Sequence, residues 1–311
     1  MSADSGAAGS GAPGTAGVIH DLGYRHYDGP RLGRGAIIRA LYWHSLRSAY
    51  GIGRGAKAKI VPILTFAIMC LPAVVNAISA ARGGGRVVLY DTYVLRLRGL
   101  IMAIFVAAQA PELVSRDLRS HVLPLYLCRP MRRLDYPLAK LAAFFAACLA
   151  LVEIPLLLLY LGTIVSAGGG AAIWSQTRAL IPGLLIGALW ALLFAAIGLA
   201  LASLTGRRAY ATGVIAIYFF LTWTLASILI GIGEGRGGPA AAAAAPLTAR
   251  LAGLISPVTV LEGVRQWLGG TSVSAVPPPG SAGPLYGAMF LALLAASLGG
   301  LAARYRKAGG S

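Results

Sequence analysis

The stretch QAPELVSRDLRSHVLPLYLCRPMRRLDYPLAK, residues 109–140, decides the fold because it is the only long polar interruption in a very apolar chain. Unpaired charges inside a bilayer are costly, so this stretch predicts a loop outside the membrane. Its basic excess indicates the cytoplasmic side. Pro124 and Pro130 divide it, and therefore one short helix is expected within it. Asp135, followed by Tyr136 and Pro137, predicts the N-cap and first turn of the next membrane helix.

The same stretch resembles the permease subunits of ABC-2 type exporters. The resemblance consists of a charged exit from an apolar segment, a short helix and a Leu-rich L-x-R-P-x-x-R run that ends in Ala-Lys. The matching positions are Glu112, Arg116, Asp117, Leu125, Leu127, Arg129, Pro130, Arg133 and Lys140. Where that family often has Gly-Thr before the leucines, this chain has Ser120 and His121.

In that family the loop forms a coupling helix that docks on a cytoplasmic ATPase. The resemblance therefore implies an ATPase-coupling set that lies around the loop. Its members are Glu112, Arg116, Asp117, Arg129, Pro130, Arg132 and Arg133.

The composition predicts a polytopic membrane protein. The 311 residues are 57% hydrophobic and 12% charged, whereas soluble domains have roughly 25% charged residues. The net charge of +17 does not indicate nucleic-acid binding, because topology explains it. Of 27 Lys and Arg residues, 19 lie in segments predicted to be cytoplasmic and eight elsewhere, which is the positive-inside bias.

Six apolar segments predict six spans with both termini in the cytoplasm. Their approximate limits are 60–81, 99–111, 138–167, 180–204, 212–233 and 285–303. Residues 82–98 are expected to form an outer loop that carries four arginines. The second span is short, but the basic segments on its two sides require an even number of crossings between them.

The predicted domains follow from these limits. Residues 1–34 are rich in Gly, Ala and Ser and are expected to form a mobile cytoplasmic tail. Residues 35–56 contain an amphipathic helix, about 36–50, that is too short and charged to span and is expected on the inner membrane surface. The ABC-2 family has such an elbow helix. Residues 57–307 form the six-span domain.

The outer segment 234–284 contains SPVTVLEGVR, which resembles the family's S-P-x-T-x-x-x-E-x-x-R signature between the fifth and sixth spans. In the family this signature forms a short hairpin of helices at the outer surface. Pro257, Thr259, Glu262 and Arg265 match it, and the last two are neighbours if the segment is helical. The alternative is an amphipathic loop helix without a special role.

The sequence lacks the motifs that several kinds of chemistry require. No G-x-x-x-x-G-K-[ST] occurs, so a P-loop on this chain is excluded and ATP and Mg²⁺ are expected on a partner subunit. Cys70, Cys128 and Cys148 lack metal-ligand spacing and are expected to be reduced and incidental. The four histidines lie outside the predicted spans, which disfavours an intramembrane enzyme.

Glu153 is the one acid well inside a predicted span. It either holds two helices together by a hydrogen bond or faces a polar path for a substrate. In the next span, Gly183 and Gly187 have the G-x-x-x-G spacing that permits close helix contact.

The sequence as a whole predicts an all-α membrane protein that serves as the permease subunit of an ATP-driven exporter in the plasma membrane. Separate ATPase subunits and a second permease subunit, identical or homologous, are the expected partners. The alternatives are a proton-coupled secondary carrier, for which internal inverted repeats would be expected, and a membrane enzyme or sensor subunit.

Overall fold

The computed structural model describes residues 29, 32–82, 90–120, 126, 128, 131–165, 167–234, 247–270 and 279–308. The chain divides into two compact units, Met1–Leu32 and Gly33–Ser311. The second unit holds every described helix, and only this unit is considered below. The predicted mobile tail therefore falls almost wholly outside the described residues.

All regular elements in the described part of the chain are helices, and six of them are long and apolar enough to cross a membrane. The prediction of a multi-pass, all-helical membrane protein is confirmed at this level. The six are α2 (Ala56–Ala81), α3 (Tyr90–Leu113), α6 (Asp135–Val165), α7 (Gly170–Ser203), α8 (Arg208–Glu234) and α12 (Gly283–Ala308).

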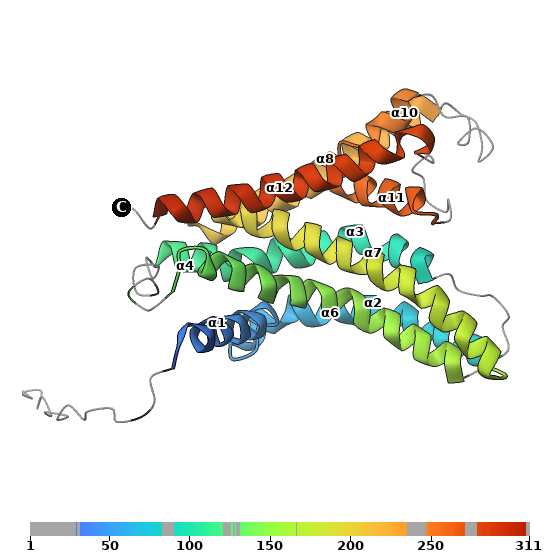
Figure 1. Cartoon of the computed structure of the whole chain (residues 1–311), viewed down its shortest axis with the longest axis horizontal. Coiled ribbons are helices and arrows are strands. Elements are labelled where there is room, and N and C mark those ends of the chain that lie inside the picture. The colour runs from blue at the N-terminus through green and yellow to red at the C-terminus, as the bar shows by residue number, and fades with distance from the viewer. Residues whose placement is uncertain are drawn as a thin grey trace, which may run out of the picture. The chain divides into compact units, whose positions relative to one another are not determined.

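In the part of the chain that the structure describes, five shorter helices lie toward the ends of these six. They are α1 (Arg34–Ala49), α4 (Ser115–Arg119), α10 (Leu247–Ala252), α11 (Pro257–Trp267) and η1 (Gly280–Ala282). Figure 1 shows α1, α4 and the end of α12 toward one end of the helices, and α10 and α11 toward the other. We call the first the basic end, defined by α1, α4, the α7–α8 turn at 204–207 and the last turns of α12.

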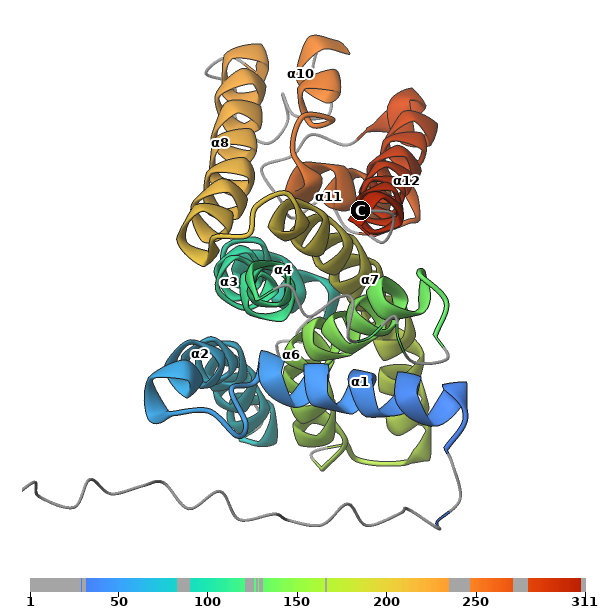
Figure 2. The same cartoon turned by 90° about the vertical axis from the view of Figure 1, so that its left-hand side faces the viewer.

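The helices α3 and α7 form the centre of the packing. In Figure 2 they lie between α2 and α6 on one side and α8, α11 and α12 on the other. The burial of these helices supports their central position. In the apolar stretch of α3, 67% of the residues are buried, and in that of α7, 61%, whereas the value is 22% for both α2 and α8. Stacked rings fill the centre: Phe105 lies 6.1 Å from Phe144, and Phe194 lies 4.5 Å from Phe219.

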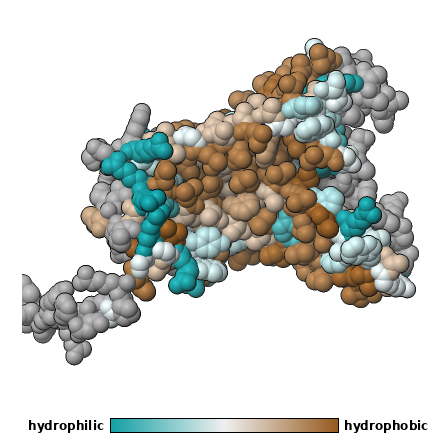
Figure 3. Space-filling model, viewed as in Figure 1, coloured by the Kyte–Doolittle hydropathy of each residue, from teal (hydrophilic) through white to brown (hydrophobic). Residues whose placement is uncertain are grey.

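The peripheral helices α2, α8 and α12 present large apolar side chains outward, such as Leu71, Ile217 and Leu291. Figure 3 shows hydrophobic residues across the middle of one face and hydrophilic residues gathered toward its two ends. A soluble protein rarely exposes so large an apolar surface, whereas lipid-facing helices require it.

Two helices begin earlier than the sequence analysis placed them. Helix α3 begins at Tyr90, inside the predicted outer loop 82–98, and it continues through Pro111 to Leu113. Helix α7 begins at Gly170 rather than near Leu180. Residues 90–98 and 171–179 contain neither Gly nor Pro, so nothing in either segment interrupts the helix. The helix of the second span is therefore longer than predicted, whereas its candidate membrane-spanning stretch begins at Gly99, as predicted, and continues past residue 111.

The start of α6 also differs in detail from the prediction. Asp135 is the first helical residue rather than the N-cap, since the N–H of Leu138 donates to the carbonyl of Leu134 at 3.1 Å. The Asp135 carboxylate accepts instead from the backbone N–H of Arg132, before the helix, at 2.8 Å. The proline at 137 lies within the first turn, as predicted.

Candidate functional site at the basic end

Three carboxylates at the basic end pair with cations that come from other segments of the chain. They are Glu112 at the end of α3, Asp117 in α4 and Asp135 at the start of α6. Each pair joins elements that are distant in sequence. The four ion pairs, two of which involve Glu112, therefore connect the helix ends of this region.

Glu112 is the most deeply enclosed of the three, with 4% of its side chain exposed. Its Oε2 lies 2.5 Å from Nη2 of Arg54, in the turn between α1 and α2. Its Oε1 pairs with Nη1 of Arg208, the first residue of α8. A buried carboxylate is costly unless paired, so the two arginines stabilise the charge and connect α3 to the α1–α2 turn and to α8.

Asp117 joins the short helix α4 to α6. Its Oδ2 lies 2.9 Å from Nζ of Lys140 and accepts a hydrogen bond of 2.5 Å from the hydroxyl of Tyr136. The ring of Tyr136 lies 5.3 Å from that of Tyr305 in α12. Next to Asp117, the buried hydroxyl of Ser115 donates to the carbonyl of Ala202 in α7 at 2.9 Å. Helix α4 is thus attached to both α6 and α7.

Asp135 connects the first helix to α6. Nε and Nη2 of Arg34 donate to its two carboxylate oxygens at 2.6 and 2.5 Å, a bidentate pair. The hydrogen bond to Asp135 raises the pKa of the Arg34 guanidinium. Arg34, which the sequence analysis assigned to the tail, is the first residue of α1. This pair fixes the beginning of α1 against the beginning of α6.

Three arginines of the implied coupling set are exposed instead of paired with these acids. They are Arg116, Arg132 and Arg133, and Arg119 of α4, which is not in the set, is exposed as well. Arg129 and Pro130 lie outside the described residues. The set implied by the resemblance is therefore divided in two: Glu112 and Asp117 are internal anchors, and the described arginines face outward.

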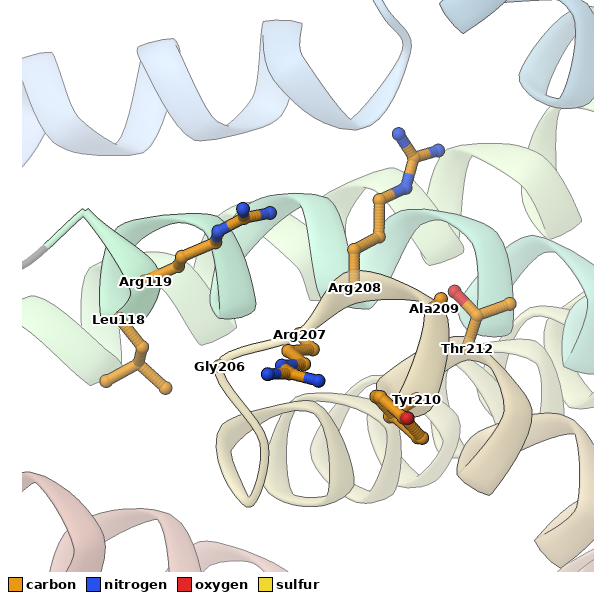
Figure 4. Close-up of a pocket in the computed structure, with 8 residues that line it drawn as sticks. All are labelled: Leu118, Arg119, Gly206, Arg207, Arg208, Ala209, Tyr210 and Thr212. Atoms are coloured by element: carbon orange, nitrogen blue, oxygen red, sulfur yellow. The ribbon is translucent and has the colours of Figure 1, made fainter.

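A cleft of about 1240 Å³ lies beside this region, between α4 and the turn from α7 to α8. Figure 4 shows the side chains of its eight described lining residues. They are Leu118, Arg119, Gly206, Arg207, Arg208, Ala209, Tyr210 and Thr212. The guanidinium of Arg207 lies 5.8 Å from the centre of the Tyr210 ring, which is a cation–π arrangement.

Glu153 lies far from this cluster along α6, where it is half-buried at the contact with α7. A Cβ added to Gly187 of α7 would collide with the Glu153 carboxylate and touch the side chain of Val152. Gly187, the second glycine of the G-x-x-x-G pair, therefore makes room for the acid. This geometry favours a role at the helix contact over a place on an open path.

The opposite end holds the three residues expected in the outer hairpin. Pro257 is the first residue of α11, and the Ser256 side chain accepts from the N–H of Val258 at 3.3 Å. Glu262 and Arg265 form a bidentate pair at 3.0 and 2.7 Å, with 3% and 1% of their side chains exposed. The expected contact between these two residues is confirmed. A Cβ on Gly263 would collide with the Tyr286 ring, so α11 packs tightly on α12.

Sequence reasoning missed the partners that complete the basic end: Arg34, Arg54, Arg208, Ser115 and Tyr136. The charge count placed the arginines on one side of the membrane but could not pair them, because Arg34 and Asp135 are 101 residues apart. The isolated acids were the one feature of the sequence that could have predicted such pairs, since a carboxylate at a helix end next to lipid requires a cationic partner.

No protein-family model matches the chain, and no curated protein sequence matches it. Among the described residues, no three His, Cys, Asp or Glu side chains come together as a metal site requires.

Proposed function

We propose that the chain is the permease subunit of an ATP-driven exporter of the ABC-2 type. In this proposal the basic end is cytoplasmic and docks a separate ATPase, and the chain forms the membrane pathway with a second permease subunit in the plasma membrane. ATP and Mg²⁺ are bound by the ATPase subunits. Helix α1 lies at the inner surface as the elbow, α4 is the coupling helix, and α10 and α11 form the outer hairpin.

The observation that carries the proposal is the attachment of α4. Its arginines face outward, while Ser115 and Asp117 tie it to α7 and α6. Just before α4, Glu112 ties the end of α3 to the start of α8. A partner that moves α4 would therefore act on four of the six candidate spans. A coupling element needs this combination of an accessible charged surface and firm internal attachment.

The test combines purification with a matched pair of variants. The tagged chain is crosslinked in its native membrane and purified, and co-purifying proteins are identified by mass spectrometry. We expect a P-loop ATPase in amounts similar to the chain. The Arg132→Glu/Arg133→Glu variant should lose most of it, because close charge pairs across an interface contribute strongly and reversal makes them repulsive.

The control variant is Lys57→Glu/Lys59→Glu, which makes the same charge change at exposed positions in the first turn of α2. It should retain the ATPase, with both variants inserted in the membrane at wild-type levels. Absence of any P-loop ATPase from the wild-type preparation, or equal retention by the two variants, would contradict the proposal.

A further inference from the structure

The cleft between α4 and the α7–α8 turn is strongly basic. Among its eight described lining residues, three are arginines and none is acidic. Arg208 already pairs with Glu112 through one nitrogen, and 62% of its side chain remains exposed. Arg119 is exposed, and Arg207 lies over the Tyr210 ring. The cleft therefore carries positive charge beyond what the buried acid neutralises, and an anion is the ligand that it fits.

The backbone adds to this preference. Arg208, Ala209 and Tyr210 form the first turn of α8, whose first N–H groups have no acceptor within the helix. The N-terminus of a 27-residue helix also carries a partial positive charge. Backbone donors and arginine side chains thus line the same cleft, which is the combination that binds phosphate groups.

The surroundings of the cleft identify the source of the phosphate. From Tyr210 an exposed apolar stripe continues along α8 at helical spacing. Its members are Tyr210, Val214, Ile217 and Leu221, with 62%, 40%, 63% and 58% of their surface exposed. The stripe lies in a helix that is long and apolar enough to span. The cleft is therefore at the boundary between water and lipid, with hydrocarbon surface directly beside it.

We propose that this cleft binds the headgroup phosphate of an anionic phospholipid, whose acyl chains lie along the α8 stripe. Arg119 and Arg207 contact the phosphate together with the first turn of α8, and Tyr210 lies at headgroup depth. An acidic peptide would use the arginines but would leave the apolar stripe unexplained, and for this reason the lipid is favoured. The proposal concerns the permease chain alone and does not depend on an ATPase partner.

Native mass spectrometry of the purified chain in detergent tests the proposal. Phosphatidylglycerol and phosphatidylcholine with the same acyl chains are titrated separately. We expect one phosphatidylglycerol to be retained more tightly than all others, and phosphatidylcholine to bind at least tenfold more weakly. Arg119→Gln/Arg207→Gln should weaken phosphatidylglycerol binding about tenfold or more, because each basic residue near an anionic headgroup contributes substantially.

The matched control is Arg116→Gln/Arg133→Gln, which removes the same charge at exposed positions outside the cleft lining. It should bind phosphatidylglycerol as the wild type does. Arg208 is left intact, because it also pairs with Glu112 and its loss would disturb the attachment of α3 to α8 as well as the cleft. The single variant Arg207→Gln, expected to be intermediate, supports the assignment if the double variant is poorly folded.

Three results would overturn the proposal. One is equal loss of phosphatidylglycerol in the cleft and control variants, and another is equal binding of phosphatidylcholine. The third is displacement of the lipid by competitors that lack acyl chains. Displacement by millimolar inorganic phosphate would assign the cleft to a free anion, and displacement by an oligoglutamate peptide would assign it to an acidic protein partner.

Discussion

The two ends of the helix bundle use ion pairs in opposite ways. At the basic end, the pairs join different segments of the chain and differ in exposure. Arg34 and Arg208 have 43% and 62% of their side chains exposed, whereas the partners in the Arg54–Glu112 and Lys140–Asp117 pairs are at most 21% exposed. At the opposite end, Glu262 and Arg265 lie three residues apart in the same helix, and at most 3% of either side chain is exposed.

This difference indicates that ion pairs at the basic end can rearrange at a small free-energy cost, whereas the Glu262–Arg265 pair cannot. Water and salt screen the Arg34–Asp135 and Arg208–Glu112 pairs, so breaking one of these and forming another costs little. A buried pair that loses one partner leaves a charge in a low-dielectric site. If the chain is a transporter, we expect conformational change to involve the helix attachments at the basic end, with α11 and α12 moving together.

The largest effect is expected at the buried pair. Glu262→Leu removes the carboxylate that the Arg265 guanidinium contacts through two nitrogens, and the loss of one partner of a buried pair costs about 3–5 kcal/mol. The midpoint of thermal unfolding in detergent measures this. The double variant Glu262→Leu/Arg265→Leu should be more stable than the single variant, and a double variant that is less stable would contradict the assignment.

A smaller effect is expected at Glu112. Glu112→Gln keeps the shape of the side chain but removes the charge that pairs with Arg54 and Arg208, and hydrogen bonds to charged groups contribute about 1.5–3 kcal/mol. Arg208→Gln should cost less, because Arg54 still neutralises the acid. Measured by thermal unfolding in detergent, the destabilisation caused by Glu112→Gln should be smaller in high salt than in low salt. An effect as large as that of Glu262→Leu would remove the contrast between the ends.

The smallest effect is expected at the outward arginines. Arg132→Ala/Arg133→Ala should change unfolding stability by less than about 0.5 kcal/mol, as surface substitutions usually do. Both side chains are exposed. A large loss of stability would show that these residues hold the fold together, and the loss of a partner in their variants could then not be assigned to docking.

The sequence predicted the elements that depend on local information. Each apolar run specifies its own span, and the three-residue spacing of Glu262 and Arg265 was enough to predict their contact. Helix starts were less predictable. Residues 90–98 and 171–179, which form the first turns of α3 and α7, resemble loops in composition, although neither segment contains a Gly or Pro that would stop a helix.

The ion pairs at the basic end join residues that are distant in sequence, so local sequence patterns could not predict them. Nothing near Glu112 indicates that Arg54 and Arg208 reach it. The resemblance implied a coupling set around α4, yet it could not separate anchors such as Asp117 from outward residues such as Arg116. The cleft likewise exists only because α4 meets the α7–α8 turn in space.

The central claim is that the basic end faces the cytoplasm and the α11 end faces outward. Cysteine labelling in intact cells tests it most directly, in a background where the exposed Cys128 is replaced by Ser. Single cysteines are placed at Ser120, exposed after α4, and at Leu268, 63% exposed after α11. We expect a membrane-impermeant maleimide to label Leu268→Cys in intact cells, and Ser120→Cys only after permeabilisation. Labelling of Ser120→Cys in intact cells, with Leu268→Cys protected, would contradict the account.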